Sequence, residues 1–430
     1  MKKIYIGIIG FGNIGSGTVK LLKKNFALIK KRIGMEIHVK RIADIDVKKN
    51  RGIKIDRKTF TKDAEEVIND PKIQIVLELM GGIHPAKEYI IQSLKKGKAV
   101  VTANKALLAE EGREILKTAL DNNQDIYFGA SVCGGIPIIK IIREGMLANR
   151  INYMAGIING TANYILSRME EGFTFKQALI DAQKKGVAEK NPSLDIEGTD
   201  TAHKLVILGS LIFNIPLTLS NIYTEGISLL TPMDLKFAKE FGYVIKLLAI
   251  AKENNGNFQF RVHPALIDTK HPLATVKDEY NAVYIEGNAT GKMLFYGKGA
   301  GQMPTASAIL SDVIDIARNF KSKTCMRIPP IVSYEKSYKV IPLQQLKSSY
   351  YLRMMAIDKP GVLAKIANIL AEYKISIASV FQKERNKAEA VPIVMMTHEA
   401  TEKNISTAIK KIDKLPAVKG NTVRIRVENS

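Results

Sequence analysis

The sequence predicts an α/β protein in three parts: a doubly wound parallel sheet, an α+β part, and a small ferredoxin-like unit. Residues 1–130 alternate apolar strands with amphipathic helices, which is typical of a parallel sheet covered by helices on both faces. From about 131 to 317 helices and strands mix without that alternation. From about 347 onward the patterns follow the order βαββαβ, which is the order of a ferredoxin-like unit.

The first part contains nine predicted elements. The expected strands are Ile4–Ile9, Glu36–Ala43, Ile73–Leu79, Ala99–Thr102 and Asp125–Phe128. The expected helices are Ser16–Ile29, Ala64–Asn69, Pro85–Lys96 and Gly112–Asn122.

The middle and last parts are predicted by the same periodicities. Helices are expected at 137–148, 161–171, 175–185, 200–213 and 234–253, and strands near 151–158, 258–267 and 280–288. A glycine-rich turn at 297–304 leads into an apolar helix from Thr305, and a basic, weakly patterned linker follows. In the last part we expect strands Tyr350–Ile357, Ile375–Gln382 and Ala390–Thr397, a helix from Val362 to Tyr373, another at 401–413, and a final strand.

Length and composition limit the class of protein. A chain of 430 residues exceeds one ordinary core, so two or three domains are expected. The mean hydropathy is −0.03, and no apolar run approaches the ~18 residues that span a bilayer. Glycines interrupt the apolar start, which we interpret as a strand and not a signal peptide. Only two cysteines are present, which excludes a disulfide framework and a Cys-based metal cluster. We expect a cytoplasmic protein without a membrane partner.

The formal net charge of +22 raises the question of a nucleic-acid partner. The lysines and arginines are scattered through every segment, tryptophan is absent, and aromatic residues make up 7% of the chain. Scattered charge without interleaved aromatic residues indicates a generally basic protein, so we expect no nucleic-acid partner. Anionic cofactors and substrates would benefit from this field.

The segment GIIGFGNIG contains G-x-G-x-x-G at Gly10, Gly12 and Gly15, after a predicted strand and before a predicted helix. These glycines allow the tight turn, the approach of a pyrophosphate and the packing of helix on strand, so a Rossmann-like dinucleotide site is predicted. The second strand is followed by both Asp44 and Asp46, which suit a ribose hydroxyl, and by basic residues that suit a 2′-phosphate. Arg41, Lys48 and Lys49 are the basic candidates, so NAD and NADP both remain open.

Three further segments carry polar groups of chemical interest. Lys105 follows a strand in the loop region where an open α/β sheet binds its ligand. Cys133 lies in the glycine-rich turn SVCGGIP, where a buried filler is favoured over a nucleophile. Asn159–Gly160–Thr161 ends a strand and opens a helix, so its N–H groups suit a carboxylate or simply cap the helix.

The stretch 185–205 gathers several carboxylates around one lysine. Glu189, Asp195, Glu197 and Asp200 surround Lys204 at a loop and helix start, an arrangement that could bind an ammonium group and hold a proton donor. The alternative is a minor i,i+4 ion pair at a helix end. His203 points about 100° away round the helix and is interpreted as structural.

With these motifs in order, the chain closely resembles homoserine dehydrogenases of the long form, which carry a C-terminal ACT domain. The resemblance runs through GFGNIG, ELMGGIHPA, GKAVVTANKALLA, SVCGGIPII, INGTANYIL, DIEGTDTAHKL, YGKGAGQMPTASA and DKPGVLAKIANIL. It implies NAD(P)-dependent interconversion of L-homoserine and L-aspartate 4-semialdehyde, in threonine and methionine biosynthesis. It also implies an NAD(P)-binding domain of 1–130 plus about 305–318, a substrate-binding and dimerisation domain of 131–304, a linker of 319–346, and an ACT regulatory domain of 347–430.

The resemblance also implies roles for individual residues. Lys204 takes the place of the family's proton donor, with Asp200 and Lys105 beside it as catalytic residues. The implied substrate-binding residues are Glu189, Asp200, Thr161, Gly160 and Asp195. The expected cofactor-binding residues are Gly10, Phe11, Gly12, Asn13, Ile14, Gly15, Arg41, Thr102, Asn104, Lys105, Gly186 and Gly301.

The sequence departs from the family pattern at two positions. The family binds a monovalent cation, Na or K, through one glutamate and several backbone carbonyls. Gly129 stands in the place of that glutamate, which leaves only the carbonyls of Val132, Gly134 and Ile136 as ligands. Val187 stands where the family often has tyrosine, so a hydroxyl contact near the substrate is missing.

The tail predicts regulation by a small molecule. Asp358, Gly361 and Asn368 lie where ACT domains often bind an amino acid, and threonine is the expected effector. A homodimer or homotetramer is expected. The alternative functions are a binding protein that senses NAD(P) and an amino acid, and a thioester-forming semialdehyde dehydrogenase that uses Cys133.

Overall fold

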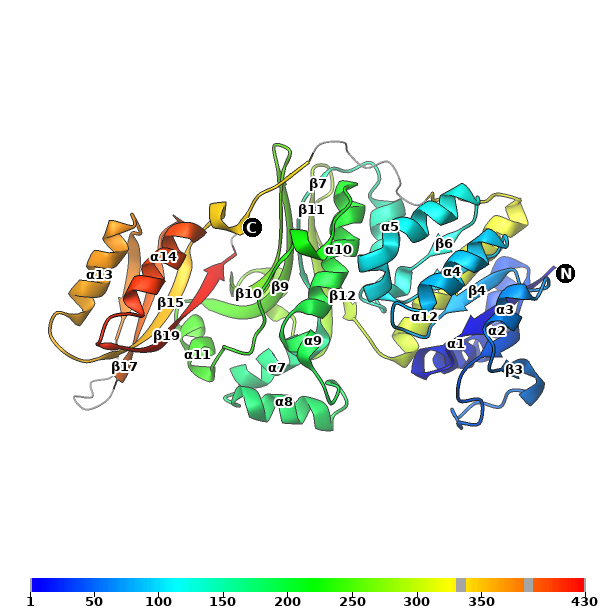
Figure 1. Cartoon of the computed structure of the whole chain (residues 1–430), viewed down its shortest axis with the longest axis horizontal. Coiled ribbons are helices and arrows are strands. Elements are labelled where there is room, and N and C mark those ends of the chain that lie inside the picture. Colours follow the sequence, from blue (N-terminus) through cyan, green and yellow to red (C-terminus); the bar gives the residue numbers. More distant parts are fainter. Residues whose placement is uncertain (1, 330–337, 383–389, 429–430) are drawn as a thin grey trace. The chain divides into compact units, whose positions relative to one another are not determined.

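The computed structural model describes residues 2–329, 338–382 and 390–428 (Figure 1). Its chain divides into two compact units. The first unit comprises Met1–Met154, Asp200–Ile222 and Asn281–Tyr338. The second comprises Ala155–Thr199, Tyr223–Tyr280 and Lys339–Ser430. In the described part of the chain, no helix has the length and apolar character needed to cross a membrane.

The first unit contains a six-stranded sheet in the order β3-β2-β1-β4-β5-β6. Every neighbouring pair in it is parallel. This order is that of a doubly wound dinucleotide-binding sheet, in which the chain reverses direction between β1 and β4. The predicted fold class is therefore confirmed for this part. The strands are β1 (Lys3–Ile9), β2 (Glu36–Ala43), β3 (Phe60–Thr61), β4 (Ile75–Glu78), β5 (Ala99–Thr102) and β6 (Ile126–Tyr127).

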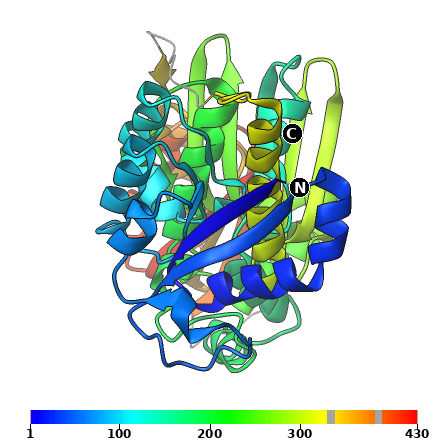
Figure 2. The ribbon, with the colours of Figure 1, turned by 90° about the vertical axis from the view of Figure 1, so that its right-hand side faces the viewer.

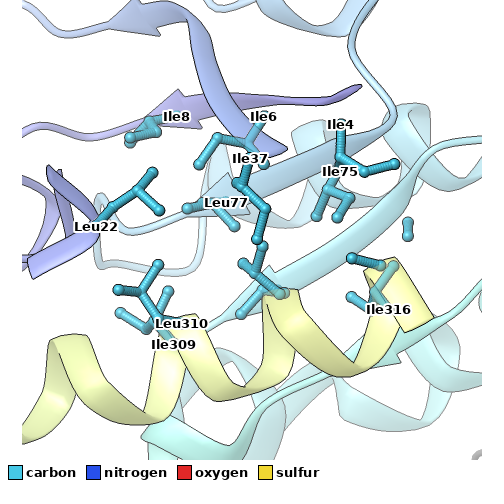
Figure 3. Close-up of a cluster of buried hydrophobic side chains, with 14 of the residues drawn as sticks. Ile4, Ile6, Ile8, Leu22, Ile37, Ile75, Leu77, Ile309, Leu310 and Ile316 are labelled. Carbon is cyan, nitrogen blue, oxygen red and sulfur yellow. The ribbon is translucent and has the colours of Figure 1, made fainter. Parts of the chain in front are cut away.

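Helices cover both faces of this sheet. On one face, Ile4, Ile6 and Ile8 of β1 share a core with apolar residues of α1 and α12 (Figure 3). The ribbons of β1 and α12 can be followed in Figure 2. On the other face, β4 and β5 pack against α3, α4 and α5. The helices are α1 (Asn13–Lys24), α2 (Phe26–Ile33), α3 (Glu65–Asn69), α4 (Ala86–Lys95), α5 (Lys105–Asp121) and α12 (Gln302–Ser322).

Three predicted helices of this unit differ from the observed ones. The single helix expected at Ser16–Ile29 is two helices, α1 and α2, which meet at Asn25. Helix α5 starts at Lys105, seven residues before the expected start, because the side chain of Asn104 accepts a hydrogen bond from Leu107 N–H and caps the helix. At the predicted helix 137–148, α6 spans only Ile138–Lys140 and continues as a π-helical turn, Ile141–Gly145.

The first unit also contains most of α10 (Thr199–Phe213), most of β11 (Tyr280–Gly287) and all of β12 (Gly291–Lys298). The first residues of α10 and β11 belong to the second unit. Strand β7 (Ile151–Ile157) starts in the first unit and ends in the second. Strand β12 was not predicted from the sequence.

The prediction of one helix at 234–253 is wrong. Only α11 (Pro232–Glu240) is helical, and the following apolar run forms β9 (Tyr243–Asn254), which pairs with β10 (Asn257–Asp268) in a twelve-residue antiparallel ladder. Strand β9 is buried from Ile245 to Ala251, so both of its faces are covered, and within this stretch only Lys246 is not apolar. A continuous apolar run has no period of two, and periodicity alone cannot distinguish it from a buried helix.

The end of the chain forms the predicted βαββαβ unit. Its sheet order is β19-β15-β17-β16, and the apolar faces of α13 and α14 complete its core. This confirms the ferredoxin-like prediction. The elements are β15 (Tyr350–Ile357), α13 (Val362–Glu372), β16 (Ile377–Phe381), β17 (Ala390–Thr397), α14 (Glu402–Ile412) and β19 (Val418–Val427).

This ferredoxin-like unit is joined to the β9–β10 hairpin within the second unit. Strand β19 pairs in parallel with β10 at Ala265↔Arg426 and Leu266↔Val427. Of the predicted linker 319–346, residues 319–322 belong to α12, Lys339–Val340 form β13 on the edge of β10, and 330–337 lie outside the described residues. The predicted domain boundaries stay predictions. The remaining elements of this unit are α7 (Gly160–Glu170), α8 (Phe175–Lys184), α9 (Ser193–Ile196), β8 (Tyr223–Thr224), β14 (Lys347–Ser348) and β18 (Ala400–Thr401).

Candidate active site

The glycine fingerprint forms a turn between β1 and α1. Gly10 has φ +92°, and a Cβ there would lie 2.6 Å from the backbone of Met80, so only glycine fits. A Cβ on Gly15 would lie 2.5 Å from the carbonyl oxygen of Gly10, whereas a Cβ on Gly12 would meet no atom within 4 Å. The backbone at Gly12 and the first turn of α1 therefore border open space, which fits the pyrophosphate of a dinucleotide.

At the end of β2, the carboxylate of Asp44 is held by several donors. The N–H of Phe11 donates to Oδ2 at 2.6 Å, and the N–H of Asp46 donates to Oδ1 at 2.8 Å. Arg51, which the sequence analysis did not single out, forms an ion pair with Oδ1 at 2.8 Å and lies over the Phe11 ring. The predicted candidate Arg41 pairs instead with Glu66. Asp44 and Arg51 are thus the charged pair next to the fingerprint turn.

Lys105, Asp200 and Lys204 form a charged cluster within the first unit. The Nζ of Lys204 lies 2.7 Å from Oδ2 of Asp200, and the Nζ of Lys105 contacts the other carboxylate oxygen. The side chain of Asp200 is 4% exposed and that of Lys204 is 11% exposed, whereas that of Lys105 is 42% exposed. The cluster holds two cations and one anion, and it borders solvent on the Lys105 side.

The electrostatics of the cluster favour the charged form of Asp200. Burial by itself raises the pKa of this carboxyl, but the charges of Lys204 and Lys105 and their hydrogen bonds outweigh that effect. The pKa of Asp200 therefore lies well below its ordinary value. A permanently ionised Asp200 can orient both ammonium groups.

Local structure explains why these side chains meet. Asp200 and Lys204 are four residues apart on α10 and so lie on one face of that helix. Lys105 is the first residue of α5, immediately after its cap. His203 points away from the cluster, and its Nε2 lies 3.5 Å from Glu110 of α5. Burial lowers the pKa of His203, which fits the structural role that we expected for it.

Within the second unit, the start of α7 is tied to the loop that follows α8. Asn159 caps α7, because its Oδ1 accepts a hydrogen bond from Ala162 N–H at 2.7 Å. Its Nδ2 donates to Oδ1 of Asp195 at 2.7 Å, and Thr161 Oγ1 donates to the carbonyl of Val187 at 3.0 Å. Thr161, Val187 and Asp195 are thus brought together.

Gly160, Gly186 and Glu189 complete the predicted set in this unit. A Cβ on Gly160 would lie 2.7 Å from the carbonyl oxygen of Glu279, so the backbones approach closely there. Gly186 has φ +71° and ends the turn after α8. The side chain of Glu189 is exposed, and its backbone carbonyl accepts a hydrogen bond from Gln183 Nε2.

Cys133 lies in the packed turn that precedes α6. The residue is 1% exposed and has φ +52°, and Asn281 Nδ2 lies 3.5 Å from its Sγ. Burial raises the pKa of its thiol, so a reactive thiolate is disfavoured. This arrangement fits a buried filler.

The predicted cation site has an unexpected neighbour. A Cβ on Gly129 would lie 2.9 Å from Oδ1 of Asp312, and Gly129 N–H donates to Oδ2 of that carboxylate at 2.8 Å. Asp312 therefore occupies the space into which a glutamate at position 129 would extend. The carbonyl of Ile136 already accepts the N–H of Ile138 at 2.7 Å. These residues do not fit the family's glutamate-plus-carbonyl cation site.

The predicted effector residues lie around the start of α13. Gly361 precedes this helix with φ +87°, Asp358 is half-buried in the turn before it, and Asn368 is exposed on the helix.

Arg51, Asp312 and Glu78 were not predicted from the sequence as residues of interest. Glu78 carried a recognisable signal, since it is a lone acid at the end of the apolar strand Ile75–Glu78. Arg51 and Asp312 carried none, because Arg51 lies in an irregular segment after β2 without a recognisable pattern, and Asp312 lies 183 residues from Gly129.

Three family models match the chain. The model "Homoserine dehydrogenase, NAD binding domain" matches residues 10–129, "Homoserine dehydrogenase" matches 137–314, and "ACT domain" matches 350–417.

Named relatives match over the full length. The chain is 44% identical to the homoserine dehydrogenase of Pseudomonas aeruginosa, with 100% of this chain and 99% of the relative covered. It is 43% identical to the homoserine dehydrogenase of Helicobacter pylori, with 100% of each covered. The crystal structure of a homoserine dehydrogenase from Thiobacillus denitrificans superposes with a TM-score of 0.91 at 43% identity, covering 100% of this chain and 99% of that one. The chain therefore belongs to the homoserine dehydrogenase family, with an NAD-binding domain and a C-terminal ACT domain.

Proposed function

We propose that Lys204 is the proton donor and acceptor of the homoserine dehydrogenase reaction, with Asp200 and Lys105 completing the catalytic cluster. As a member of this family, the chain is an NAD(P)-dependent oxidoreductase that interconverts L-homoserine and L-aspartate 4-semialdehyde, a step in threonine and methionine biosynthesis. The observation that carries the proposal is the contact of both lysines with the buried carboxylate of Asp200.

The chemistry requires a proton at one oxygen atom. The bound nicotinamide supplies the hydride that adds to the aldehyde carbon, or accepts it in the reverse direction. As the C–H bond forms, the carbonyl oxygen becomes an alkoxide, and the ammonium group of Lys204 transfers its proton to that oxygen. In the oxidation direction, neutral Lys204 takes the proton from the hydroxyl group. Proton transfer from a positioned side chain contributes about 10²–10⁴-fold to the rate.

Asp200 and Lys105 support this transfer. Ionised Asp200 holds the Nζ of Lys204 through its Oδ2. Lys105 adds a second positive charge, which stabilises the negative charge that develops on the substrate oxygen. For the substrate's polar end we propose Thr161, Gly160, Glu189 and Asp195, since Thr161 and Asp195 are fixed by hydrogen bonds and Glu189 offers an exposed carboxylate.

We propose NADP as the preferred cofactor. The carboxylate of Asp44, which would suit a ribose hydroxyl, already accepts two backbone N–H groups and pairs with Arg51. Arg51 places a guanidinium at the same end of β2, where its Nη1 donates to the carbonyls of Asp46 and Lys49 and its Nη2 pairs with Asp44. This fixed positive charge favours a nearby phosphate. Replacement of Arg51 by alanine should weaken NADP binding more than NAD binding. An unchanged ratio of the two dissociation constants would argue against this assignment.

The proposal for Lys204 is tested with Lys204→Ala. We expect kcat for homoserine oxidation to fall by about 10²–10⁴-fold while the Kd for NADP(H) stays within about twofold. The exposed Lys190→Ala is the matched control and should keep wild-type turnover. Near-normal turnover of Lys204→Ala with bound cofactor would overturn the assignment. If the wild-type protein formed no reduced nicotinamide from homoserine and NAD⁺ or NADP⁺, that result would instead favour a protein that senses these ligands.

We further propose threonine as the ligand of the ACT domain, bound near Asp358, Gly361 and Asn368. We also propose that the protein forms a homodimer or homotetramer and is located in the cytoplasm. The sequence of the turn and the exposure of Asn368 support the effector site. Kinetics with and without threonine test it, since unchanged parameters would remove threonine as effector. A monovalent cation is not part of the proposal, because Asp312 occupies the space of the expected glutamate.

A further inference from the structure

Glu78 is a buried acid that the mechanism above does not use. It is the last residue of β4, between Ile9 of β1 and Thr102 of β5 in the sheet register, and it is 0% exposed. A carboxylate in this position is unusual, because the other residues of β4 are apolar.

The groups around Glu78 stabilise its ionised form. The hydroxyl of Thr102 donates to Oε2 at 2.6 Å, and the N–H of Met80 donates to Oε1 at 2.9 Å. Burial raises the pKa of Glu78 above its ordinary value, and these donors, the N–H of Gly81 and the side chain of Asn104 lower it only in part. All four groups are donors toward the carboxylate, which is the pattern of an anion site.

No positive side chain compensates this charge in the described part of the chain. No lysine or arginine among those residues forms an ion pair with Glu78. Burying a charge without an opposite charge beside it costs free energy, so buried charges normally pair with an opposite charge or bind a ligand. Glu78 therefore has donors from the protein but lacks an opposite charge.

The position of Glu78 in the sheet indicates where a counter-charge would come from. In a sheet of this order the ligand binds outside the carboxyl ends of the strands, at the reversal between β1 and β4. The fingerprint turn after β1 suits the pyrophosphate, and Asp44 and Arg51 after β2 lie at the adenosine end. The nicotinamide half then belongs on the side of β4 and β5, where Glu78 lies. In its oxidised form the nicotinamide ring is a cation, and in its reduced form it is neutral.

We propose that Glu78 supplies the counter-charge for the oxidised nicotinamide ring, so that the protein binds NAD(P)⁺ more tightly relative to NAD(P)H than an uncharged site would. The carboxylate acts through its charge and also positions the loop ends, since Thr102 and Asn104 lead directly into Lys105. Asn104 N–H donates to Thr102 Oγ1 at 3.0 Å, so the hydroxyl that donates to Glu78 is itself held by the residue that caps α5.

The test is the binding of both redox forms to Glu78→Gln in the absence of substrate. Because Glu78→Gln removes the negative charge that would attract the oxidised ring, we expect the ratio Kd(NADP⁺)/Kd(NADPH) to rise about tenfold, which corresponds to about 1.4 kcal/mol. The Kd for NADPH should change by less than about threefold, because the reduced ring carries no charge that Glu78 could attract. Fluorescence of NADPH and calorimetry of NADP⁺ measure the two constants independently of Lys204 and of turnover.

Glu114→Gln, on the exposed side of α5, is the matched control. It removes a carboxylate of the same unit by the same substitution, so the ratio should stay within about twofold of wild type. Glu78→Asp is a second variant in case Glu78→Gln fails to fold. Glu78→Asp keeps the negative charge but moves the carboxylate back by one methylene group. The ratio Kd(NADP⁺)/Kd(NADPH) should therefore rise, but by less than in Glu78→Gln. Equal changes in both constants for every Glu78 variant would show a purely structural role and overturn the proposal.

Discussion

Two buried aspartates near helix starts, Asp200 in the first unit and Asp234 in the second, differ in how their charge is neutralised. Asp234 is 0% exposed and accepts hydrogen bonds from the backbone and hydroxyl of Thr231, from Tyr351 and from Arg353. Asp200 is also buried, but its partners are two lysines, and one of them, Lys105, is 42% exposed.

The two arrangements suit different tasks. Arg353 is 9% exposed and reaches both oxygens of Asp234, so this pair is neutral overall, fixed in geometry and closed to solvent. Burial and the charge of Asp234 raise the pKa of Tyr351, which keeps its hydroxyl a donor. The Asp200 cluster carries an excess positive charge on flexible side chains. The Asp234–Arg353 pair, in which the two charges neutralise each other, stabilises the fold. The Asp200 cluster has an excess positive charge and borders solvent, so it can stabilise a substrate oxygen that becomes negative during the reaction.

The largest expected effect is on stability in the second unit. Asp234→Asn leaves the buried guanidinium of Arg353 without its anion, which should lower the free energy of unfolding by about 3–5 kcal/mol. Urea denaturation measures this loss. The double variant Asp234→Asn/Arg353→Met should recover much of it, because no unpaired charge remains. A single variant as stable as wild type would show that the pair contributes little.

The same substitution in the other cluster should act on turnover. Asp200→Asn keeps the shape but no longer orients Lys204, so we expect kcat to fall by about 10²-fold with little change in the Kd for the cofactor. Its effect on unfolding should be smaller than that of Asp234→Asn, because Lys105 reaches solvent. Steady-state kinetics and urea denaturation of both variants test the comparison directly. The comparison would be contradicted if Asp200→Asn and Asp234→Asn lowered kcat and the free energy of unfolding to the same extent.

A third buried carboxyl, Asp312, forms no ion pair with another described residue and should make stability depend on pH. Burial raises the pKa of Asp312 to about 7, against the hydrogen bond from Gly129. Between about pH 4 and pH 7 the folded protein holds a proton that the unfolded chain has lost, so the free energy of unfolding falls as the pH rises through this window.

Asp312→Asn removes that dependence. Each pH unit of the window corresponds to about 1.4 kcal/mol, so over about three units we expect the variant to exceed wild type by about 4 kcal/mol above pH 7 and to match it near pH 4. Thermal unfolding across this range measures the difference. Parallel curves for the two proteins would assign the pH dependence to other groups.

The smallest expected effect concerns Cys133. Because its thiol is buried and its pKa is raised, Cys133→Ala should keep kcat within about twofold of wild type. A loss of turnover above about 100-fold, with the fold intact by circular dichroism, would restore the thioester mechanism.

Local patterns predicted the ends of the molecule better than its middle. The βα alternation and the glycine fingerprint predicted the doubly wound sheet, and the tail pattern predicted the ferredoxin-like unit. Strand β9 was mistaken for a helix, because a strand buried on both faces loses the alternation that identifies strands. Strand β12 was missed as well.

By itself, the sequence determined the fold class, the fingerprint turn and the i,i+4 pair of Asp200 and Lys204, because each depends on spacing along a single segment. Only the tertiary structure decided that Lys105 joins this pair, that Arg51 engages Asp44, and that Asp312 takes the space beside Gly129. These partners lie between seven and 183 residues apart in the sequence. The charge of a side chain can be read from its residue type, but the group that it contacts depends on how the whole unit packs.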